Sequence, residues 1–150
     1  MPAPPPGPPP TTRYWHLWTD ADGTSHQQAR ALDRFSAASM GGAAPQWNDE
    51  QPDTPVKVIF SVQPAGWMGD WHENPAPQWI VPLSGRWFVE SMDGQRVEMG
   101  PGEASFGEDQ GCVADAQGRR GHRSGTVGNE PAHLMIVQLA PRRTGSDGPR

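Results

Sequence analysis

The sequence predicts an all-β domain, either an antiparallel sandwich or a barrel. Short segments rich in aromatic and β-branched residues recur along the chain, turn residues separate them, and helical periodicity is scarce. Short strands at regular spacing, joined by hairpin turns, are typical of sandwiches and barrels. The segments expected to be strands are 14–18, 57–62, 78–83, 86–91, 95–99, 104–106 and 132–139.

Turn chemistry marks where these strands end, because glycine and asparagine tolerate the backbone conformations that tight turns need. The expected turns lie at 84–85, 93–94, 101–102 and 128–131. Residues 25–40 are the one candidate helix, although they can equally be irregular chain leading into a strand. Residues 41–55 are rich in Gly, Pro, Asn and Asp, so we expect a long loop there, with Trp47 as an anchor.

The composition of the chain points to a folded domain. Its 150 residues include 18 glycines and 18 prolines, but also seven Trp, four Phe and one Tyr. Disordered segments are poor in aromatic residues, whereas here aromatic and β-branched residues cluster between 57 and 139. A chain of this length suits one domain. We therefore expect a disordered proline-rich tail over 1–12, a single domain over 13–140 and a disordered tail over 141–150.

Charge and cysteine content narrow the range of partners. The 17 acidic and 12 basic residues give a net charge of −5, which argues against nucleic-acid binding. Arg119, Arg120 and Arg123 form a local cluster between glycines, which favours a solvated loop over a phosphate site. Cys112 is the single cysteine and cannot form an intrachain disulfide. With no apolar stretch of about 20 residues and no secretory signal, we expect a cytoplasmic protein that binds no membrane.

The strongest candidate for a functional motif lies in residues 66–85. Gly66 is followed after five residues by His72, then by Asn74, by Gln78 and finally by Gly85. This spacing resembles the first motif of the cupin family, which reads Gly, five residues, His-x-His, three or four residues, Glu, six residues, Gly. Asn74 and Gln78 stand where that motif has its second His and its Glu.

A second, looser motif lies further along the chain. Residues 99–103 resemble the Pro-Gly turn of the second cupin motif, and His122 is the downstream candidate for its histidine. Residues 108–121 read as an extended loop inserted before that histidine. The resemblance is to small, single-domain bacterial cupins. It implies a double-stranded β-helix, the jelly-roll cupin barrel, over residues 13–140, and commonly a homodimer.

The resemblance also implies a metal site formed by His72, Gln78 and His122, with Asn74 as a further candidate. Two imidazoles and one amide oxygen would leave two or three positions open for water or substrate. Such a site suits a divalent ion of Fe, Zn, Ni or Mn without selecting among them. Because Gln78 is neutral where the family has Glu, the ion would be bound more weakly and act as a stronger Lewis acid.

Further residues are candidates for the substrate site. Trp71, Trp79 and Trp87 are expected to wall a pocket, which would suit a small aromatic or sugar-derived molecule. Candidates for a general acid or base are Glu90, Glu108 and Asp109.

Two functions follow from these residues. The first is a metal-dependent enzyme that acts on a small organic molecule by oxygenation, isomerisation or dehydration. The second is a non-catalytic module that has lost its metal and binds or senses a small ligand, because Asn74 and Gln78 replace two ligand residues.

Overall fold

The structure, a computed structural model, describes residues 3–140 of the chain. Within that range it contains eleven strands and no helix, so no helix there could span a membrane. The all-β class expected from the sequence is confirmed, and the strands form the two main sheets that the expected jelly-roll requires. The strands are β1 (Thr12–Thr19), β2 (Ser25–Leu32), β3 (Ser36–Ala38), β4 (Gln46–Asn48), β5 (Val56–Gln63), β6 (Gln78–Ser84), β7 (Arg86–Ser91), β8 (Arg96–Met99), β9 (Ser105–Glu108), β10 (His122–Val127) and β11 (Ala132–Leu139).

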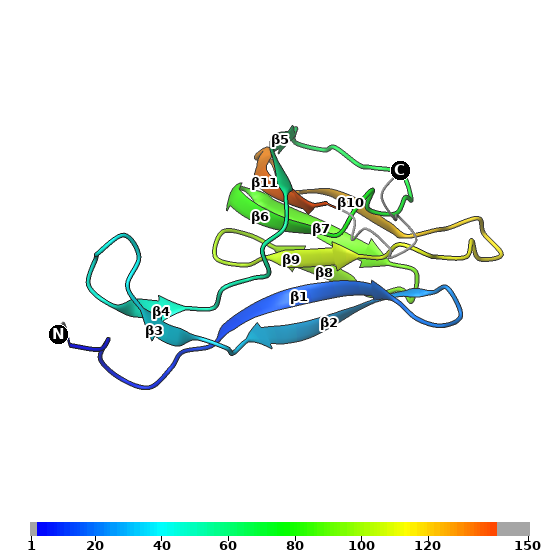
Figure 1. The fold of residues 1–150 in the computed structure, drawn as a ribbon. Helices are drawn as coiled ribbons and strands as arrows, with labels where there is room; N and C mark the ends of the chain where they lie inside the picture. Colours follow the sequence, from blue (N-terminus) through cyan, green and yellow to red (C-terminus); the bar gives the residue numbers. More distant parts are fainter. Residues whose placement is uncertain (1–2, 141–150) are drawn as a thin grey trace, which may run out of the picture.

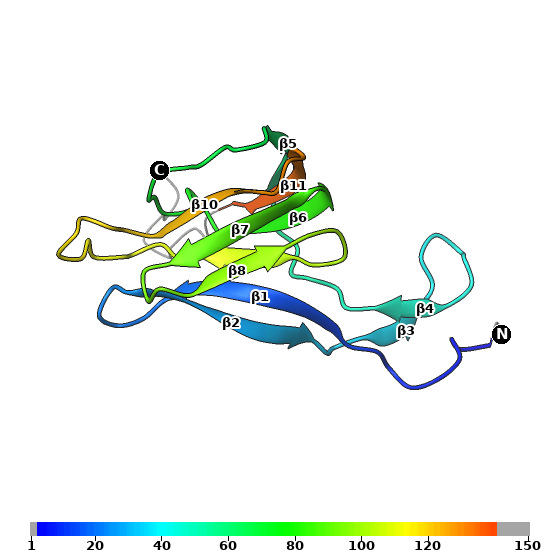
Figure 2. The same ribbon diagram turned by 180° about the vertical axis from the view of Figure 1, so that it is seen from behind.

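The strands form two main sheets that face each other. The large sheet has the order β2-β1-β9-β6-β11-β5, and the small sheet has the order β10-β7-β8. Figure 1 shows the large sheet from the front, and Figure 2 shows the small sheet from behind. β1 and β9 run parallel, whereas the other pairs are antiparallel. β3 and β4 form a separate hairpin that projects away from both sheets.

The core lies between the two sheets and is built by strand alternation. In β7, Trp87 and Val89 point inward, and Trp87 is only 1% exposed. They meet Leu17 and Leu134 from the large sheet. Burying such large apolar side chains supplies most of the stability of a small domain. The remaining members of the core cluster are Val97, Met99 and Ala132, with Trp15 and Ile80 packed against it.

The candidate helix at 25–40 is not formed. All eight residues of β2 pair with β1, from Ser25 opposite Thr19 to Leu32 opposite Thr12. This stretch has a strand period, because Ser25 and Gln27 are buried and their neighbours are more exposed. The long loop expected over 41–55 is interrupted by β4, where Trp47 pairs with Ala37. The tail expected over 141–150 lies outside the described residues.

A histidine clamped by two carboxylates ties the β1–β2 turn to the β7–β8 turn. His26 Nε2 lies 2.6 Å from Asp20 Oδ2, and its Nδ1 lies 3.0 Å from Asp93 Oδ2. The hydrogen bond to Asp20 raises the pKa of His26, and burial opposes it only in part. The same hydrogen bond lowers the pKa of Asp20. The ring of Trp18 stacks on His26 at 5.0 Å.

This cluster predicts a pH dependence of stability. The pKa of His26 is raised on folding, so protonated His26 stabilises the folded state. This stabilisation is fully present when the pH is below 6.5, the pKa of an unperturbed histidine, and it is lost as the pH rises through the pKa of the folded state. The pKa of Asp20 is lowered on folding, so its contribution to stability is present when the pH is above 3.8, the unperturbed pKa of an aspartate. That contribution is lost as the pH falls through the lower pKa of the folded state. We expect the melting temperature of wild-type protein to decline above pH 6.5 by more than that of His26→Gln. Equal declines in a calorimetric pH series would contradict this, and His133→Gln is the matched control.

Candidate functional site

His72 and His122 lie side by side at one end of the barrel. They form an isolated antiparallel bridge in which each backbone N–H donates to the other residue's carbonyl oxygen at 2.9 Å. Their imidazole rings are 4.6 Å apart between centroids and tilted by 51°. His122 is the first residue of β10 and is 4% exposed, whereas His72 is exposed to solvent. The structure therefore brings together the two histidines of the predicted metal site.

The chain before β6 is held against β10 by backbone hydrogen bonds. Thr126 N–H donates to the carbonyl of Trp67, and Gly69 N–H donates to the carbonyl of Ser124, at 2.9 and 2.8 Å. Gly121 makes the final approach, since an added Cβ there would lie 2.2 Å from the carbonyl oxygen of His72. Its φ of +77° is also one that glycine adopts readily. A residue without a side chain therefore permits the contact between the two histidines.

Asp109 is the centre of the hydrogen bonds behind His122. It is fully buried, and its Oδ2 lies 2.7 Å from His122 Nδ1. Its Oδ1 accepts hydrogen bonds from the backbone N–H and the side-chain Nδ2 of Asn74, both at 2.9 Å. Burial by itself would raise the pKa of Asp109. The hydrogen bond and charge of His122 and the Asn74 N–H outweigh burial, so that this pKa lies below its usual value.

Asn74 and Gln78 belong to a chain of amides that ends at Asp109. Gln138 Nε2 donates to Gln78 Oε1 at 3.0 Å, and Gln78 Nε2 donates to Asn74 Oδ1 at 2.7 Å. The amide of Asn74 then donates to Asp109. The oxygens of both amides are therefore already engaged by other side chains. In this arrangement they support the Asp109 carboxylate, which in turn orients His122.

The hydrogen bonds of the two histidines decide which ring nitrogen is free. The Nδ1 of His72 lies 2.7 Å from the carbonyl oxygen of Asp70, which can only accept. The Nδ1 of His122 faces a carboxylate of lowered pKa. Neutral rings in both positions carry their proton on Nδ1 and present a lone pair on Nε2. Among residues 3–140, neither Nε2 has a hydrogen-bond partner.

This donor set fits a divalent ion through its histidines alone. Two imidazoles in neighbouring positions on one ion have ring centroids about 4.5 to 5 Å apart, given metal–nitrogen bonds of about 2.1 Å. The observed 4.6 Å agrees with that separation. Oxygen partners on both Nδ1 atoms are the usual support of metal-binding histidines. No group of three His, Cys, Asp or Glu side chains suited to one ion occurs within the described part of the chain.

The predicted acids lie in different places. Asp109 belongs to the site, but both of its oxygens are occupied by the contacts that orient His122. Glu90 faces outward from the small sheet and accepts two hydrogen bonds from Arg123. Glu108 lies on the outer face of the large sheet, 2.5 Å from His16 Nε2. Glu90 is thus bonded to Arg123 and Glu108 to His16, and neither contacts the histidine pair.

The three predicted pocket tryptophans do not come together. Trp87 belongs to the apolar core, and Trp79 lies on the outer face of the large sheet, where its ring packs against Phe106 and Tyr14. Trp71 is half-buried beside the guanidinium groups of Arg119 and Arg123, 5.4 and 5.6 Å from its ring centre.

Several residues of the site were not predicted. Gln138 lies 60 residues from Gln78, and only the pairing of β11 with β6 places them together. Glu73 accepts hydrogen bonds from the N–H of Cys112 and from Arg120, which ties the loop over 109–121 to the histidine segment. For Gly121, the one signal in the sequence is its position immediately before His122.

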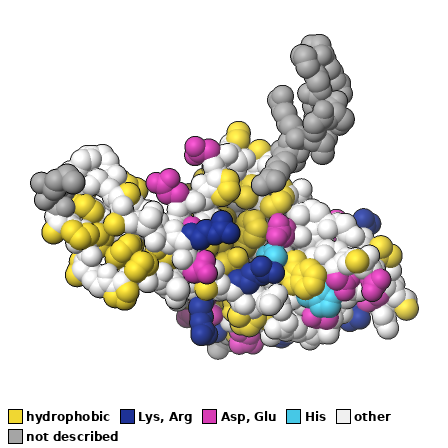
Figure 3. All heavy atoms as spheres, turned by 60° about the horizontal axis from the view of Figure 1, so that its bottom comes forward, with side chains coloured by type: hydrophobic (Ala, Val, Ile, Leu, Met, Phe, Trp, Pro, Cys, Tyr) yellow, Lys and Arg dark blue, Asp and Glu magenta, His cyan; other side chains and the backbone are white. Residues whose placement is uncertain are grey.

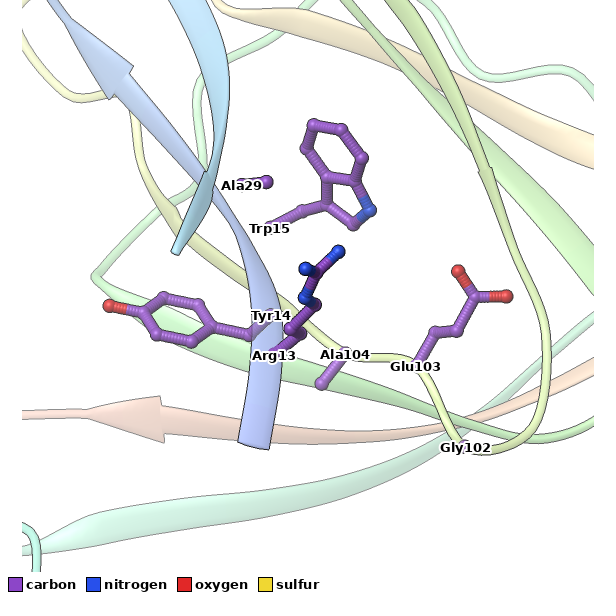
Figure 4. A pocket seen from close by; sticks show the side chains of 7 residues that line it. All are labelled: Arg13, Tyr14, Trp15, Ala29, Gly102, Glu103 and Ala104. Carbon is purple, nitrogen blue, oxygen red and sulfur yellow. The ribbon is translucent and has the colours of Figure 1, made fainter. Parts of the chain in front are cut away.

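Cavities of ligand size lie away from the histidine pair. One of about 320 Å³ lies between β1, β2 and the β8–β9 turn, and Figure 4 shows Arg13, Trp15 and Glu103 around it. Arg13 takes part in none of the ion pairs found within residues 3–140. A second cavity of about 330 Å³ touches Gln138, the outer end of the amide chain. A third, of about 520 Å³, lies beside residues 30–34 and 49–52.

No protein-family model matches the chain, and no curated protein matches it. Similar solved structures include protein NMB1881 from Neisseria meningitidis, 13% identical over 71% of this chain and 84% of that one, with a TM-score of 0.42. The DMSP lyase DddQ from Ruegeria pomeroyi DSS-3 is 19% identical over 76% of this chain and 51% of that one, with a TM-score of 0.45. The cupin domain of Schizosaccharomyces pombe Cnp3 is 11% identical over 77% and 74%, with a TM-score of 0.41.

Proposed function

We propose that the chain is a metal-dependent cupin enzyme that acts on a small organic molecule, with a divalent ion held by His72 and His122. The observation that supports this proposal is the pair of adjacent imidazoles with both Nδ1 atoms bonded to oxygen and both Nε2 atoms free. A bound ion of Fe, Zn, Ni or Mn would act as a Lewis acid on an oxygen of water or substrate.

The residues of the chain have separate parts in this proposal. Asp109 holds the proton of His122 on Nδ1 and fixes the ring, and Asn74 in turn fixes Asp109. The Asp70 carbonyl does the same for His72. Because His72 is exposed and His122 is buried, a ligand would approach from the side of His72. The reaction classes proposed are oxygenation, isomerisation and dehydration of an aromatic or sugar-derived substrate.

Elemental analysis of untagged protein tests the proposal. We expect His72→Ala to lose the ion, because only two protein ligands hold it. His133→Ala is the matched control, since it removes an exposed histidine elsewhere and should keep the ion. Less than about 0.1 ion per chain after exposure to Fe, Zn, Ni or Mn would refute a metal-dependent function. Retention of full occupancy in His72→Ala would place the ion elsewhere.

A non-catalytic ligand-binding module is the second candidate. It is favoured by the amides of Asn74 and Gln78, whose oxygens are engaged within the chain rather than free for a metal. The cavity beside Arg13 and Trp15 has room for a small organic acid. In this case, binding of small carboxylates measured by thermal shift should survive a chelator and should weaken in Arg13→Ala. Cytoplasmic location and the absence of nucleic-acid binding remain predictions.

A further inference from the structure

Arg13 and Glu103 carry opposite charges and line the same cavity without pairing with each other. This cavity of about 320 Å³ lies between β1, β2 and the β8–β9 turn. Figure 4 shows the guanidinium of Arg13 and the carboxylate of Glu103 extending into the same open space, beside the indole ring of Trp15. Among residues 3–140, no ion pair joins the two.

Strand alternation makes this cavity an open end of the space between the two sheets. Arg13, Trp15 and Leu17 are alternate residues of β1 and point to the same side of the large sheet. Leu17 is buried in the core, Trp15 is half-buried against it, and Arg13 is exposed. This row of β1 therefore leads from the apolar core to a positive charge at the opening, with Ala29 of β2 paired to Trp15.

The β8–β9 turn holds Glu103 at the other side of the opening. Its backbone N–H donates to the carbonyl of Gly100 at 3.1 Å, and Gly102 has a φ of +90°, which glycine adopts readily. The N–H of Trp15 donates to the carbonyl of Ala104 at 2.9 Å and joins the turn to β1. The Oε1 of Glu103 accepts from the N–H of Gly100, whereas its Oε2 has no partner among the described residues.

Opposite charges elsewhere on the surface lie close together. The three arginines between residues 119 and 123 are each 2.7 to 3.0 Å from a carboxylate oxygen. Figure 3 shows acidic side chains next to histidines around β1 and β2, where Glu108 and Asp20 each pair with a histidine. By contrast, the basic neighbour of Glu103 within residues 3–140 is Arg86, at 4.0 Å with both side chains about half exposed, so this pair contributes little. The cavity is thus a place where both charges stay available.

We propose that this cavity binds a small molecule that carries both a carboxylate and an ammonium group, such as an amino acid. Arg13 binds the carboxylate, because a guanidinium offers two parallel N–H donors to it. Glu103 accepts from the ammonium group through its free oxygen. The apolar part of the ligand packs on Trp15 and Ala29, and a cavity of about 320 Å³ lies at the small end of the range for ligand sites.

The two charges select this ligand class over a simple acid or a simple amine. Glu103 repels a carboxylate that brings no positive charge, and Arg13 repels an ammonium group that brings no negative charge. Only a molecule with both groups satisfies both side chains at once. The inference rests on the ligand-binding candidate above and specifies its ligand.

The cavity and the histidine pair lie at opposite ends of β1. Arg13 is near the start of this strand, and the six residues from there to Thr19 span roughly 20 Å. Beyond Thr19, the first residue of β2 contacts the histidine segment, because Ser25 Oγ donates to the carbonyl of Gly121 at 2.6 Å. Ligand binding in the cavity is therefore independent of any metal ion on the histidines.

Isothermal titration calorimetry in the presence of a chelator tests the proposal with matched probes. The amino acids are L-valine and γ-aminobutyrate, which differ in the distance between their charged groups. Isovalerate and butyrate are their analogues without the amine, and isobutylamine and propylamine are those without the carboxylate. We expect at least one amino acid to bind at least about tenfold more tightly than both of its analogues.

Two variants should change these affinities in different ways. Glu103→Gln should weaken amino acid binding about tenfold and strengthen binding of the carboxylate analogue, because a repelling charge is removed. Arg13→Gln should weaken both. Arg30→Gln and Glu98→Gln are the matched controls, since each removes one charge from an exposed residue that does not line the cavity, and they should leave the affinities unchanged. A merely structural effect would weaken all ligands alike.

Three outcomes would overturn the proposal. The first is that neither amino acid binds at about 10 mM, and if the carboxylates also fail, the ligand-binding candidate falls with it. The second is equal affinity for an amino acid and its carboxylate analogue, which would identify a simple acid site and leave that candidate standing. The third is an amino acid affinity that is the same in Glu103→Gln as in Glu98→Gln.

Discussion

Replacing Asp109 by Ala should lower the free energy of unfolding by about 3 to 5 kcal/mol, the cost of removing one partner of a buried, hydrogen-bonded pair. The substitution leaves three donors without an acceptor, namely His122 Nδ1 and the backbone and side-chain nitrogens of Asn74. All three lie in residues that are less than 5% exposed, so water does not readily replace the carboxylate. For a domain of this size, the melting temperature should fall by roughly 6 to 20 °C.

Asp109→Asn is the matched control, because it keeps one oxygen acceptor and nearly the same volume. We expect its loss of stability to be clearly smaller than that of Asp109→Ala in urea unfolding. If the proposed ion is present, Asp109→Ala should bind it more weakly than Asp109→Asn, because only the alanine variant deprives His122 of the acceptor that fixes its proton on Nδ1. Equal stability of Asp109→Ala and wild-type protein would show that the hydrogen bonds around Asp109 contribute little.

Gly121→Ala should separate the two histidines without changing either. The new Cβ would lie 2.2 Å from the His72 carbonyl oxygen and 2.4 Å from the carbonyl carbon, both of which are backbone atoms. The φ of +77° adds about 1 kcal/mol of strain for a residue with a side chain. The overlap adds about 1 to 3 kcal/mol more or breaks the bridge. We expect a stability loss of at least about 2 kcal/mol, and loss of any bound ion.

Gly118→Ala separates the two causes, because Gly118 has a similar φ of +76° and no atom within 4 Å of an added Cβ. It should show the cost of backbone strain alone, about 1 kcal/mol. Chemical denaturation of the two variants in parallel gives both values. A loss no greater for Gly121→Ala than for Gly118→Ala would mean that the segment around His72 moves aside at no cost.

Local pattern was sufficient to predict most of the strands. The segments at 14–18, 57–62 and 86–91 lie within β1, β5 and β7, since alternation of large apolar residues and flanking turns are properties of neighbouring residues. The pattern failed at 25–40, where polar residues such as Gln27 form a strand. There the reason is tertiary: Gln27 Nε2 donates to the carbonyl oxygens of Val89 and Gln95, and β1 supplies the backbone partners.

The motif spacing placed His72 and His122 in one predicted metal site, although 49 residues of chain separate them, and the structure brings the two side by side. The sequence shows two histidines of the type that binds metals, with Gly66 before the segment of His72 and Gly121 immediately before His122. The contact itself depends on β10 pairing with the chain before β6, which no local pattern encodes.

By itself, the sequence determined the all-β class, the positions of the turns and the choice of His72 and His122 as a pair. These depend on residue type and on spacing along the chain. The tertiary structure alone decided that Asn74 and Gln78 hold Asp109, that Trp87 lies in the core and that Trp79 faces outward. An amide or an indole can serve as ligand, pocket wall or packing group with equal chemistry. Which role it takes depends on the partners that sheet register places beside it, such as Gln138 opposite Gln78.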